Sequence, residues 1–440
     1  MKRNKWKEFA ALITKSSWQV KLSAVLMGSG QILYGRIGKG IIFLAIQILF
    51  IMYVIKRGIT DFIGFFTLGT VKANTWSKVA GDNSVVMLLM GILAWIVLIL
   101  FAIVHNINLR DAYQTQLDVE SGRRKLSLVQ EFRRLCDKKF YIVALTLPVI
   151  GVCVFSILPI VFMILIAFTN YGGSIVPPEL VDWVGFANFK KLITLKQFSG
   201  TFGRILSWNL LWAIVSTLLN YFAGLGLALL INYDKVKCKA VWRFFPILAV
   251  AIPGFISMIA YKFMFAYSGP VNQIIVGMGY KEIGFLSIDA KWTARFIGLF
   301  VNCWIGTPMI MMLSTGMLSN RDPNVYEAAN LDGASKWKQF TKLTLPYMLF
   351  STTPILIGQF VANFNNFGVF YYLRDGIYQD GYFLANNTDL LINWLFNMSI
   401  SNNYYCTGAA ISIVIFAITS AISLTVYVKS PAFKEDDLYR

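Results

Sequence analysis

The sequence has 440 residues, of which 57% are hydrophobic and only 14% are charged. Soluble domains are about half apolar and about a quarter charged, so this composition argues against a soluble protein and indicates membrane spans. The net charge of +18 does not indicate nucleic-acid binding, because the basic residues cluster between apolar runs and accompany no nucleic-acid fold pattern. In those short segments basic residues set the topology and meet anionic membrane lipid.

Eight apolar runs approach or exceed the roughly 20 residues that a helix needs to cross a bilayer. We expect each run to be an α-helix, since backbone polar groups must be satisfied within the hydrocarbon. The predicted fold is therefore an all-α integral membrane protein with about eight transmembrane helices. The predicted spans are residues 39–56, 85–104, 141–168, 207–232, 243–267, 295–318, 345–370 and 408–428.

The spans divide the chain into five predicted parts. Segment 17–38, which is rich in glycine, is typical of an amphipathic or re-entrant hairpin at the inner membrane surface. The parts are a cytoplasmic N-terminal segment (1–38), two accessory transmembrane helices (39–104), a cytoplasmic linker (105–140), a six-helix core (141–428) and a cytoplasmic tail (429–440).

The distribution of lysine and arginine predicts the orientation. With the N-terminus in the cytoplasm, inner segments hold 27 of the 40 basic residues, outer segments hold 12, and Lys262 lies in a span. This bias predicts a multi-pass protein of the cell membrane with both termini cytoplasmic. No short apolar segment with a cleavage site follows the basic N-terminus, so we expect no removable signal peptide.

The sequence lacks the common motifs of catalysis and energy conversion. It has no GxxxxGK[ST] loop for ATP phosphates and no paired intramembrane carboxylates for a proton relay. It has no HExxH or GxSxG motif, and its five cysteines are scattered. We therefore expect no catalytic residue, metal or cofactor in this chain, and a transport path powered by a partner.

The most informative cytoplasmic segment is 321–348, which reads RDPNVYEAANLDGASKWKQFTKLTLPYM. Pro323, capped by Asp322, favours a helix start, and Gly333 is expected to be the left-handed residue after that helix. A second helix is expected over 335–343, before the next span. Small alanines beside a carboxylate suit the approach of another protein, although an ordinary charged loop is the alternative.

The spacing EAA–x3–G–x11–LP in this loop resembles the EAA loop of ABC importer permeases. In that family the loop is a coupling helix that docks in a cleft of an ATPase subunit. The resemblance implies that two partner ATPase subunits bind ATP and Mg and drive alternating access. The residues implied to couple to the ATPase, within loop 321–346, are Glu327, Ala328, Ala329 and Gly333.

Two spans that flank the loop carry candidate substrate residues. Gln359, Asn363 and Asn366 share one helical face of the seventh span. Their amides suit either hydrogen bonds between helices or recognition of sugar hydroxyls, and the sequence leaves both open. In the sixth span Gly306 and Met309 share a face with Asn302, and Pro308 is expected to distort the helix.

These spans strengthen the resemblance. The motifs WIGTPMIMML, VANFNNFGVFYYL (361–373) and TDLLINWLF (388–396) are similar to the MalF-type permeases of maltose/maltodextrin importers, over about residues 140–440. The resemblance implies a type I ABC importer permease fold, with Gly306, Asn363 and Asn366 at sugar-contacting positions. Met309 stands where the best-known member has an aromatic ring, and Gln359 replaces a small hydroxyl residue, so the glycan stays open.

The sequence thus predicts a permease subunit that imports oligosaccharides. The partners implied are a second, MalG-like permease subunit, two ATPase subunits and an extracytoplasmic sugar-binding protein. The predicted substrates are maltose and maltodextrins, and galacto-oligosaccharides are the main alternative. Loops 268–294 and 371–407 are candidates for contact with the binding protein, the second with an acidic character that includes Asp389. A secondary sugar transporter is a weaker alternative, because it leaves the EAA loop unexplained.

Overall fold

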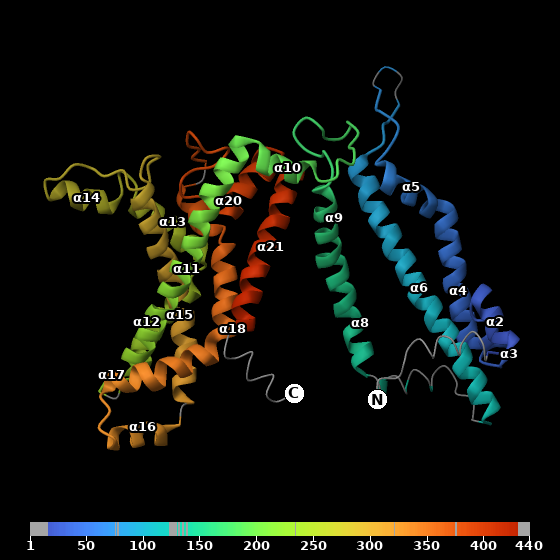
Figure 1. The fold of residues 1–440 in the computed structure, drawn as a ribbon, viewed down its shortest axis with the longest axis horizontal. Coiled ribbons are helices and arrows are strands. Elements are labelled where there is room, and N and C mark those ends of the chain that lie inside the picture. The colour runs from blue at the N-terminus through green and yellow to red at the C-terminus, as the bar shows by residue number, and fades with distance from the viewer. Residues whose placement is uncertain are drawn as a thin grey trace. The chain divides into compact units, whose positions relative to one another are not determined.

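A computed structural model describes most of the chain between residues 16 and 429. It leaves out 75, 77–78, 123–129, 131–132, 134–135, 138–139, 234, 321 and 375. The basic N-terminal residues 1–15, most of the predicted tail 429–440 and part of the predicted linker lie outside the described residues. The described chain is helical and forms two compact units, Met1–Gly185 and Phe186–Arg440 (Figure 1). The predicted domain boundaries, which place the third span in the core, stay a prediction.

The predicted all-helical membrane fold is confirmed. Seven helices of the described chain are long and apolar enough to cross a membrane, and a helix pair bent by 91° adds an eighth if the pair counts as one span. The bent pair occupies the predicted fifth span. The seven helices are Ile37–Thr67, Ser84–Glu120, Val143–Ile166, Lys196–Asn232, Lys291–Ser319, Lys336–Arg374 and Tyr405–Lys429.

The break in the fifth span lies at Ile252 and Pro253. Both residues have extended backbone angles between the two helices. A proline disfavours helical geometry in the residue before it, which explains why the helix stops there. By contrast, helix α15 runs unbroken through Pro308, so the distortion predicted there does not interrupt the span.

The first unit contains three apolar spans and a short helical hairpin before them. Helix α5 packs so closely on α6 that a Cβ atom on Gly91 would lie 2.5 Å from Cβ of Phe65. Helix α6 continues to Glu120, so the start of the predicted polar linker is helical. The helices are α2 (Trp18–Val25), α3 (Ser29–Leu33), α4 (Ile37–Tyr53), α5 (Ile59–Thr67), α6 (Ser84–Glu120), α8 (Phe140–Val152) and α9 (Leu158–Ile166).

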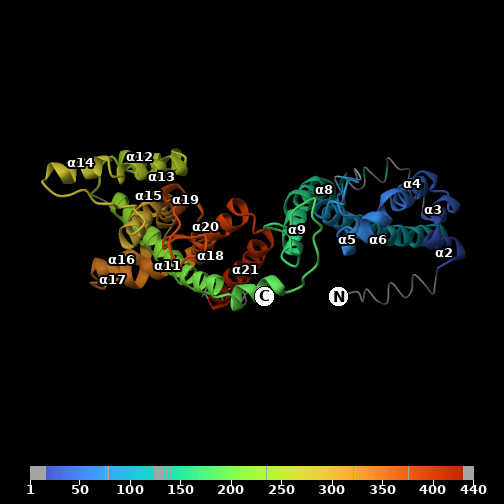
Figure 2. The ribbon, with the colours of Figure 1, turned by 90° about the horizontal axis from the view of Figure 1, so that it is seen from above.

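The second unit is built on α11, which packs against α15 and α18. Glycines permit the close approach, since a Cβ atom on Gly224 would lie 2.6 Å from Cβ of Ile310. Helices α12, α13 and α14 lie along one side of this unit in Figure 2. The helices are α10 (Ala187–Thr194), α11 (Lys196–Asn232), α12 (Lys239–Ala251), α13 (Gly254–Met264), α14 (Pro270–Gly277), α15 (Lys291–Ser319), α16 (Pro323–Leu331), α17 (Lys336–Gln339), α18 (Leu345–Phe364), α19 (Gly368–Arg374), α20 (Leu391–Phe396) and α21 (Tyr405–Lys429).

A buried arginine holds one end of this unit together. The guanidinium of Arg374 donates to Oδ1 of Asn387 at 3.0 Å and to Oγ1 of Thr388 at 2.9 Å. It also donates to the carbonyls of Ser287 and Ile288 at 2.8 and 3.2 Å. Arg374 is 1% exposed, so these bonds replace its contacts with water. The loop before α20 is thereby tied to the loop before α15.

The same loop also binds a second arginine and buries its aspartate. Arg295 donates to the carbonyl of Asn387 at 2.6 Å and lies over the ring of Trp208, 3.8 Å from its centroid. Asp389 is 4% exposed and accepts from the backbone N–H of Asn386 at 3.0 Å. Asp389 is therefore a buried structural residue, not part of a solvated acidic loop; Asp375 lies outside the described residues.

We predict that Arg374→Ala destabilises the protein, because it leaves several buried acceptors without a donor. Each such loss costs about 1–3 kcal/mol. The melting temperature of the purified protein in detergent should fall by several degrees. Arg204→Ala is the matched control, since Arg204 is an exposed arginine of the same unit with a cation–π contact to Tyr382. Equal melting temperatures for the two variants would contradict the role of Arg374.

Candidate functional site

The loop between α15 and α18 begins with the short helix α16. The carboxylate of Asp322 accepts a hydrogen bond from the N–H of Asn324 at 2.9 Å, and Pro323 is the first helical residue. Gly333 follows the helix with φ +70, and the N–H of Ala334 donates to the carbonyl of Ala329 at 2.9 Å. The predicted helix and its left-handed end are confirmed.

Side-chain contacts hold α16 against the following helical segment. Oδ1 of Asn330 accepts from Nε2 of Gln339 at 2.7 Å, and the hydroxyls of Tyr326 and Thr344 lie 3.0 Å apart. Gln339 and Thr344 are buried, at 4% and 3% exposure. These contacts join Tyr326 and Asn330 of α16 to the helical segment that follows.

The second predicted helix of the loop is not separate from the next span. Helix α17 passes through a π-helical turn, Phe340–Thr344, directly into α18. Ser335 caps its start, since its Oγ accepts from the N–H of Lys338 at 3.3 Å. Pro346 lies in the first turn of α18, after the wider turn. The expected boundary between helix 335–343 and the span is therefore absent, and one helix runs from Lys336 to Phe364.

The outward surface of α16 combines small, acidic and large apolar residues. Glu327 and Ala328 are exposed, as is Gly333, whereas Ala329 is half-buried. Leu331 is 89% exposed, and Trp337 on the adjoining helix α17 is 72% exposed. Helix α16 lies at the opposite end of the second unit from α14 and α20 (Figure 1).

An amide network that includes the predicted substrate residues Asn363 and Asn366 connects three spans. Nδ2 of Asn302 donates to Oδ1 of Asn363 at 3.2 Å, and Nδ2 of Asn366 donates to Oδ1 of Asn302 at 2.9 Å. Nδ2 of Asn363 donates to Oγ1 of Thr217 at 3.0 Å. The indole N–H of Trp212 donates to the carbonyl of Asn363 at 3.1 Å. The network thus joins α11 and α15 to α18 and the residues just after it.

The network bears on the two interpretations that the sequence leaves open. Asn363 is 5% exposed and Asn366 is half-buried, and both make hydrogen bonds between helices. A primary amide has two donor hydrogens and two acceptor lone pairs. The Asn363 side chain donates one hydrogen bond and accepts one, so one donor and one acceptor site of that amide stay available. Interhelical bonding therefore does not exclude contact with a sugar.

The other predicted substrate residues lie around this network. A Cβ atom on Gly306 would lie 2.4 Å from Nδ2 of Asn220, so this glycine lets α11 and α15 approach. Met309 is 63% exposed. Gln359 is half-buried, and its Oε1 has no hydrogen-bond partner among the described residues. The structure thus joins Asn363 and Asn366 through Asn302, with no hydrogen bond from either to Gln359 in the described chain.

Sequence reasoning missed the polar residues of the fourth span. Besides Thr217, helix α11 carries Asn209, whose Nδ2 donates to the carbonyl of Phe364 at 3.1 Å. Ser216 and Asn220 are buried on the same helix. The spacing of residues 209, 216 and 220 places them on one helical face, and this pattern is a signal that the sequence already contained.

Comparisons with known proteins agree with the resemblance. The family of binding-protein-dependent transport system inner membrane components matches residues 220–430. The chain is 31% identical over 437 residues to the maltodextrin transport system permease protein MdxF of Bacillus subtilis (strain 168), covering 97% of this chain and 98% of that one. It is 31% identical over 420 residues to the galactooligosaccharides transport system permease protein GanP of the same organism, covering 94% and 98%.

A solved structure agrees with the fold. The structure of a bacterial ABC transporter that imports the acidic polysaccharide alginate matches with a TM-score of 0.54 and 21% sequence identity. The match covers 67% of this chain and 96% of that chain. At this identity the likeness shows the architecture alone.

We predict that Thr217→Val destabilises the protein, whereas Thr217→Ser does not. Valine has the shape of threonine but leaves Nδ2 of Asn363 without its acceptor, and such bonds contribute about 1–2 kcal/mol in a membrane. The melting temperature in detergent should fall for valine and stay near wild type for serine. Equal melting temperatures for the two variants would show that the hydroxyl of Thr217 does not hold the network.

Proposed function

We propose that this chain, which belongs to the family of permease subunits of binding-protein-dependent (ABC-type) sugar importers, forms part of the membrane path for maltose and maltodextrins. The membership makes it a multi-pass membrane permease. The observation that carries the finer proposal is α16, an exposed helix with the EAA spacing that is braced to a continuous helix leading to the amide network. We place both termini in the cytoplasm, as the charge distribution indicates.

The surface of α16 has the properties of a docking site for an ATPase subunit. Ala328 and Gly333 permit close backbone approach, and Glu327 offers a carboxylate to a basic group of the partner. Leu331 and Trp337 supply apolar area whose burial favours association. Two ATPase subunits would bind ATP and Mg, and this chain would contribute Glu327, Ala328, Ala329 and Gly333 to the coupling contact.

The continuous helix supplies a route from that contact to the substrate path. From Lys336 to Phe364 it is about 43 Å long at the usual helical rise. The bonds Asn330–Gln339 and Tyr326–Thr344 fix α16 to the start of this helix, and Asn363 lies at its far end. A displacement of α16 would therefore tilt or shift α18 and the bonded amides, because a helix resists compression along its axis. This movement would alternate access to the path.

The substrate path would use the face of α15 and α18 that carries the predicted residues. Oε1 of Gln359 accepts no bond within the described chain, so it suits a sugar hydroxyl as donor. Asn363 and Asn366 would use the donor and acceptor sites that the network leaves available. Gly306 keeps the path open beside Asn220, and Met309 offers an exposed thioether side chain for the apolar face of a sugar.

The remaining partners follow from the importer architecture. A second, MalG-like permease would complete the path, and an extracytoplasmic sugar-binding protein would deliver the substrate. The candidate contacts for the binding protein are loops 268–294 and 371–407. The second of these is tied down by Arg374, so its exposed part projects from a fixed base. Galacto-oligosaccharides are the second candidate substrate, since GanP matches as closely as MdxF.

We predict that Glu327→Lys abolishes ATP-dependent uptake of labelled maltodextrin into vesicles that carry the assembled complex. The substitution places a cation where the partner's basic group would meet a carboxylate, so the ATPase should dissociate. Glu120→Lys is the control, because Glu120 is an exposed carboxylate at the end of α6, away from the EAA spacing. Uptake that persists without ATP or the ATPase subunits would favour a secondary transporter.

We predict that Asn363→Ala lowers uptake by about fivefold while the complex stays assembled, the loss expected for one hydrogen bond of about 1 kcal/mol. Unlabelled maltodextrin should compete with the labelled sugar more strongly than galacto-oligosaccharides do. Stronger competition by galacto-oligosaccharides would overturn the choice of sugar without affecting the importer. Dissociation of the complex by Asn363→Ala would assign this residue to assembly alone.

A further inference from the structure

Residues 17–38 fold as a helical hairpin that packs on α4 and α6. Helix α2 ends at Val25 and α3 begins at Ser29, and Gly28 in the turn has φ +83. A Cβ atom on Gly28 would lie 2.0 Å from the carbonyl oxygen of Gly40, so the turn rests directly on the backbone of α4. The hairpin therefore has a fixed position in the first unit.

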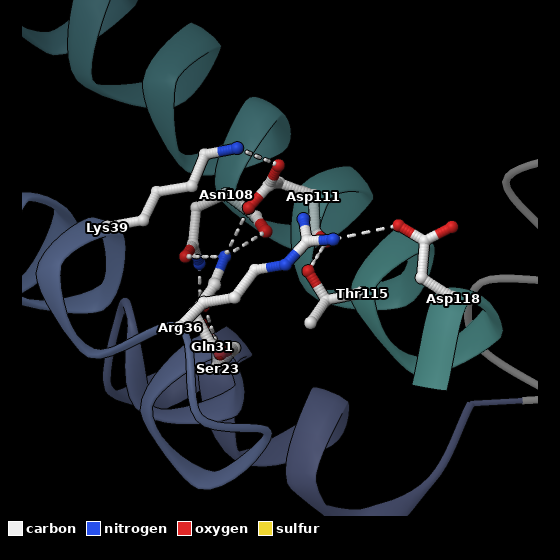
Figure 3. Close-up of polar contacts among 8 residues, drawn as sticks. All are labelled: Ser23, Gln31, Arg36, Lys39, Asn108, Asp111, Thr115 and Asp118. Carbon is white, nitrogen blue, oxygen red and sulfur yellow. Dashed lines mark hydrogen bonds and ion pairs between the residues drawn. The ribbon is translucent and has the colours of Figure 1, made fainter. Parts of the chain in front are cut away.

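The buried face of this hairpin is polar. Ser23, Gln31 and Asn108 are each 0% exposed. Nε2 of Gln31 donates to Oδ1 of Asn108 at 3.2 Å and to Oδ2 of Asp111 at 3.2 Å (Figure 3). Thr115 adds a bond to the carbonyl of Asp111 at 2.7 Å. Polar groups thus fill the contact between the hairpin and α6.

Two ion pairs enclose this polar contact. Arg36 pairs with Asp118 at 2.9 Å, and Lys39 pairs with Asp111 at 2.6 Å (Figure 3). The side chains of Arg36 and Asp118 are only 10% and 19% exposed. Charged groups turned away from the surroundings and toward one another are expected where the surroundings are not water.

The exposed face of the hairpin is mainly apolar, and the exposed Lys21 also lies on it. Trp18, Leu22 and Val25 lie at i, i+4 and i+7 of α2, so they share one face. Their exposed fractions are 65%, 40% and 76%, and Leu33 of α3 is 52% exposed. A hairpin in water would reverse this arrangement, because burial of apolar side chains is the main favourable term of folding there.

The backbone at the turn is satisfied by side chains of the spans. The N–H of Met27 donates to Oε1 of Gln47 at 2.7 Å, and Nε2 of Gln47 donates to the carbonyl of Val25 at 2.8 Å. The N–H of Gly28 donates to Oδ1 of Asn108 at 3.0 Å. Gln47 lies about 15 Å along α4 from Ile37. Non-helical backbone at membrane depth requires such internal partners.

We propose that residues 17–38 form a re-entrant membrane hairpin whose apolar face is covered by lipid acyl chains of the leaflet in which α4 begins. Helix α4, on which the hairpin packs, also exposes apolar side chains, since Ile41 and Ile48 are 54% and 50% exposed. The turn contacts α4 at Gly40 and is bonded to the side chain of Gln47, three and ten residues beyond the first residue of that helix. The polar interior of the hairpin supplies the hydrogen bonds that hydrocarbon cannot supply. The outer surface of the hairpin therefore suits contact with acyl chains better than contact with water.

Spin labels on the full chain test this proposal. Val25→Cys is made in a variant whose five native cysteines are replaced, and the labelled protein is reconstituted in phosphatidylcholine–phosphatidylglycerol vesicles. Collision rates with oxygen and with a water-soluble nickel chelate are then compared. Ile48→Cys on α4 is the lipid-exposed standard, and Val325→Cys on α16 is the water-exposed standard. Gel filtration checks that each variant is folded, and sugar uptake in the assembled complex is a second check for Val25→Cys and Ile48→Cys.

The label at Val25→Cys should show the oxygen-to-nickel ratio of Ile48→Cys, several-fold above that of Val325→Cys. A ratio near that of Val325→Cys would overturn the proposal, because the hairpin would then lie in water. Low collision rates with both reagents would also overturn it, because protein would cover the face. Gln47→Leu, which removes the bonds at the turn, should shift the ratio at Val25→Cys toward the water standard, whereas an unchanged ratio would show that Gln47 does not hold the turn in the membrane.

Discussion

The structure depends on one constraint: a polar group inside a bilayer has no water to bind, so its partner must come from the chain itself. Asn363 is bonded to Asn302 and Thr217 between three spans. Gln47 bonds both the N–H of Met27 and the carbonyl of Val25 at a turn. In each case a few long-range hydrogen bonds fix the arrangement of the apolar helices. Apolar contacts alone would not fix it, because lipid tails solvate apolar side chains as well as another helix does.

The same constraint bears on the coupling role that we propose for the loop at α16. Outside the membrane, water competes for polar groups, so an exposed helix needs specific contacts to move with its neighbour. Gln339 and Thr344 supply them from positions that are almost fully buried. The absence of a break between α17 and α18 then makes a single rigid element, with the amide of Asn363 at the other end.

The sequence predicted the features that depend on local composition. The eight span positions follow from the length of apolar runs, and α16 follows from Asp322, Pro323 and Gly333. Features set by distant partners were missed. Asp389 is buried because the loop around it binds Arg374, which is 13 residues from Asn387, and Arg295, which is 92 residues from it. The polar face of α11 has a readable spacing, but its partners lie on α18. The fifth span breaks at Pro253, whereas the sixth span continues through Pro308. The presence of a proline does not by itself distinguish these two spans.

The dual nature of the amides limits what sequence can say about the substrate. Asparagine in a span serves helix packing and sugar recognition through the same donor and acceptor atoms, so Asn363 and Asn366 carry both signals at once. Gln359 differs, because its Oε1 is buried and takes no bond from the described residues. Such an acceptor is costly unless another molecule supplies the donor. A sugar hydroxyl would satisfy that need, and for this reason we propose Gln359, more than either asparagine, as the residue that distinguishes substrates.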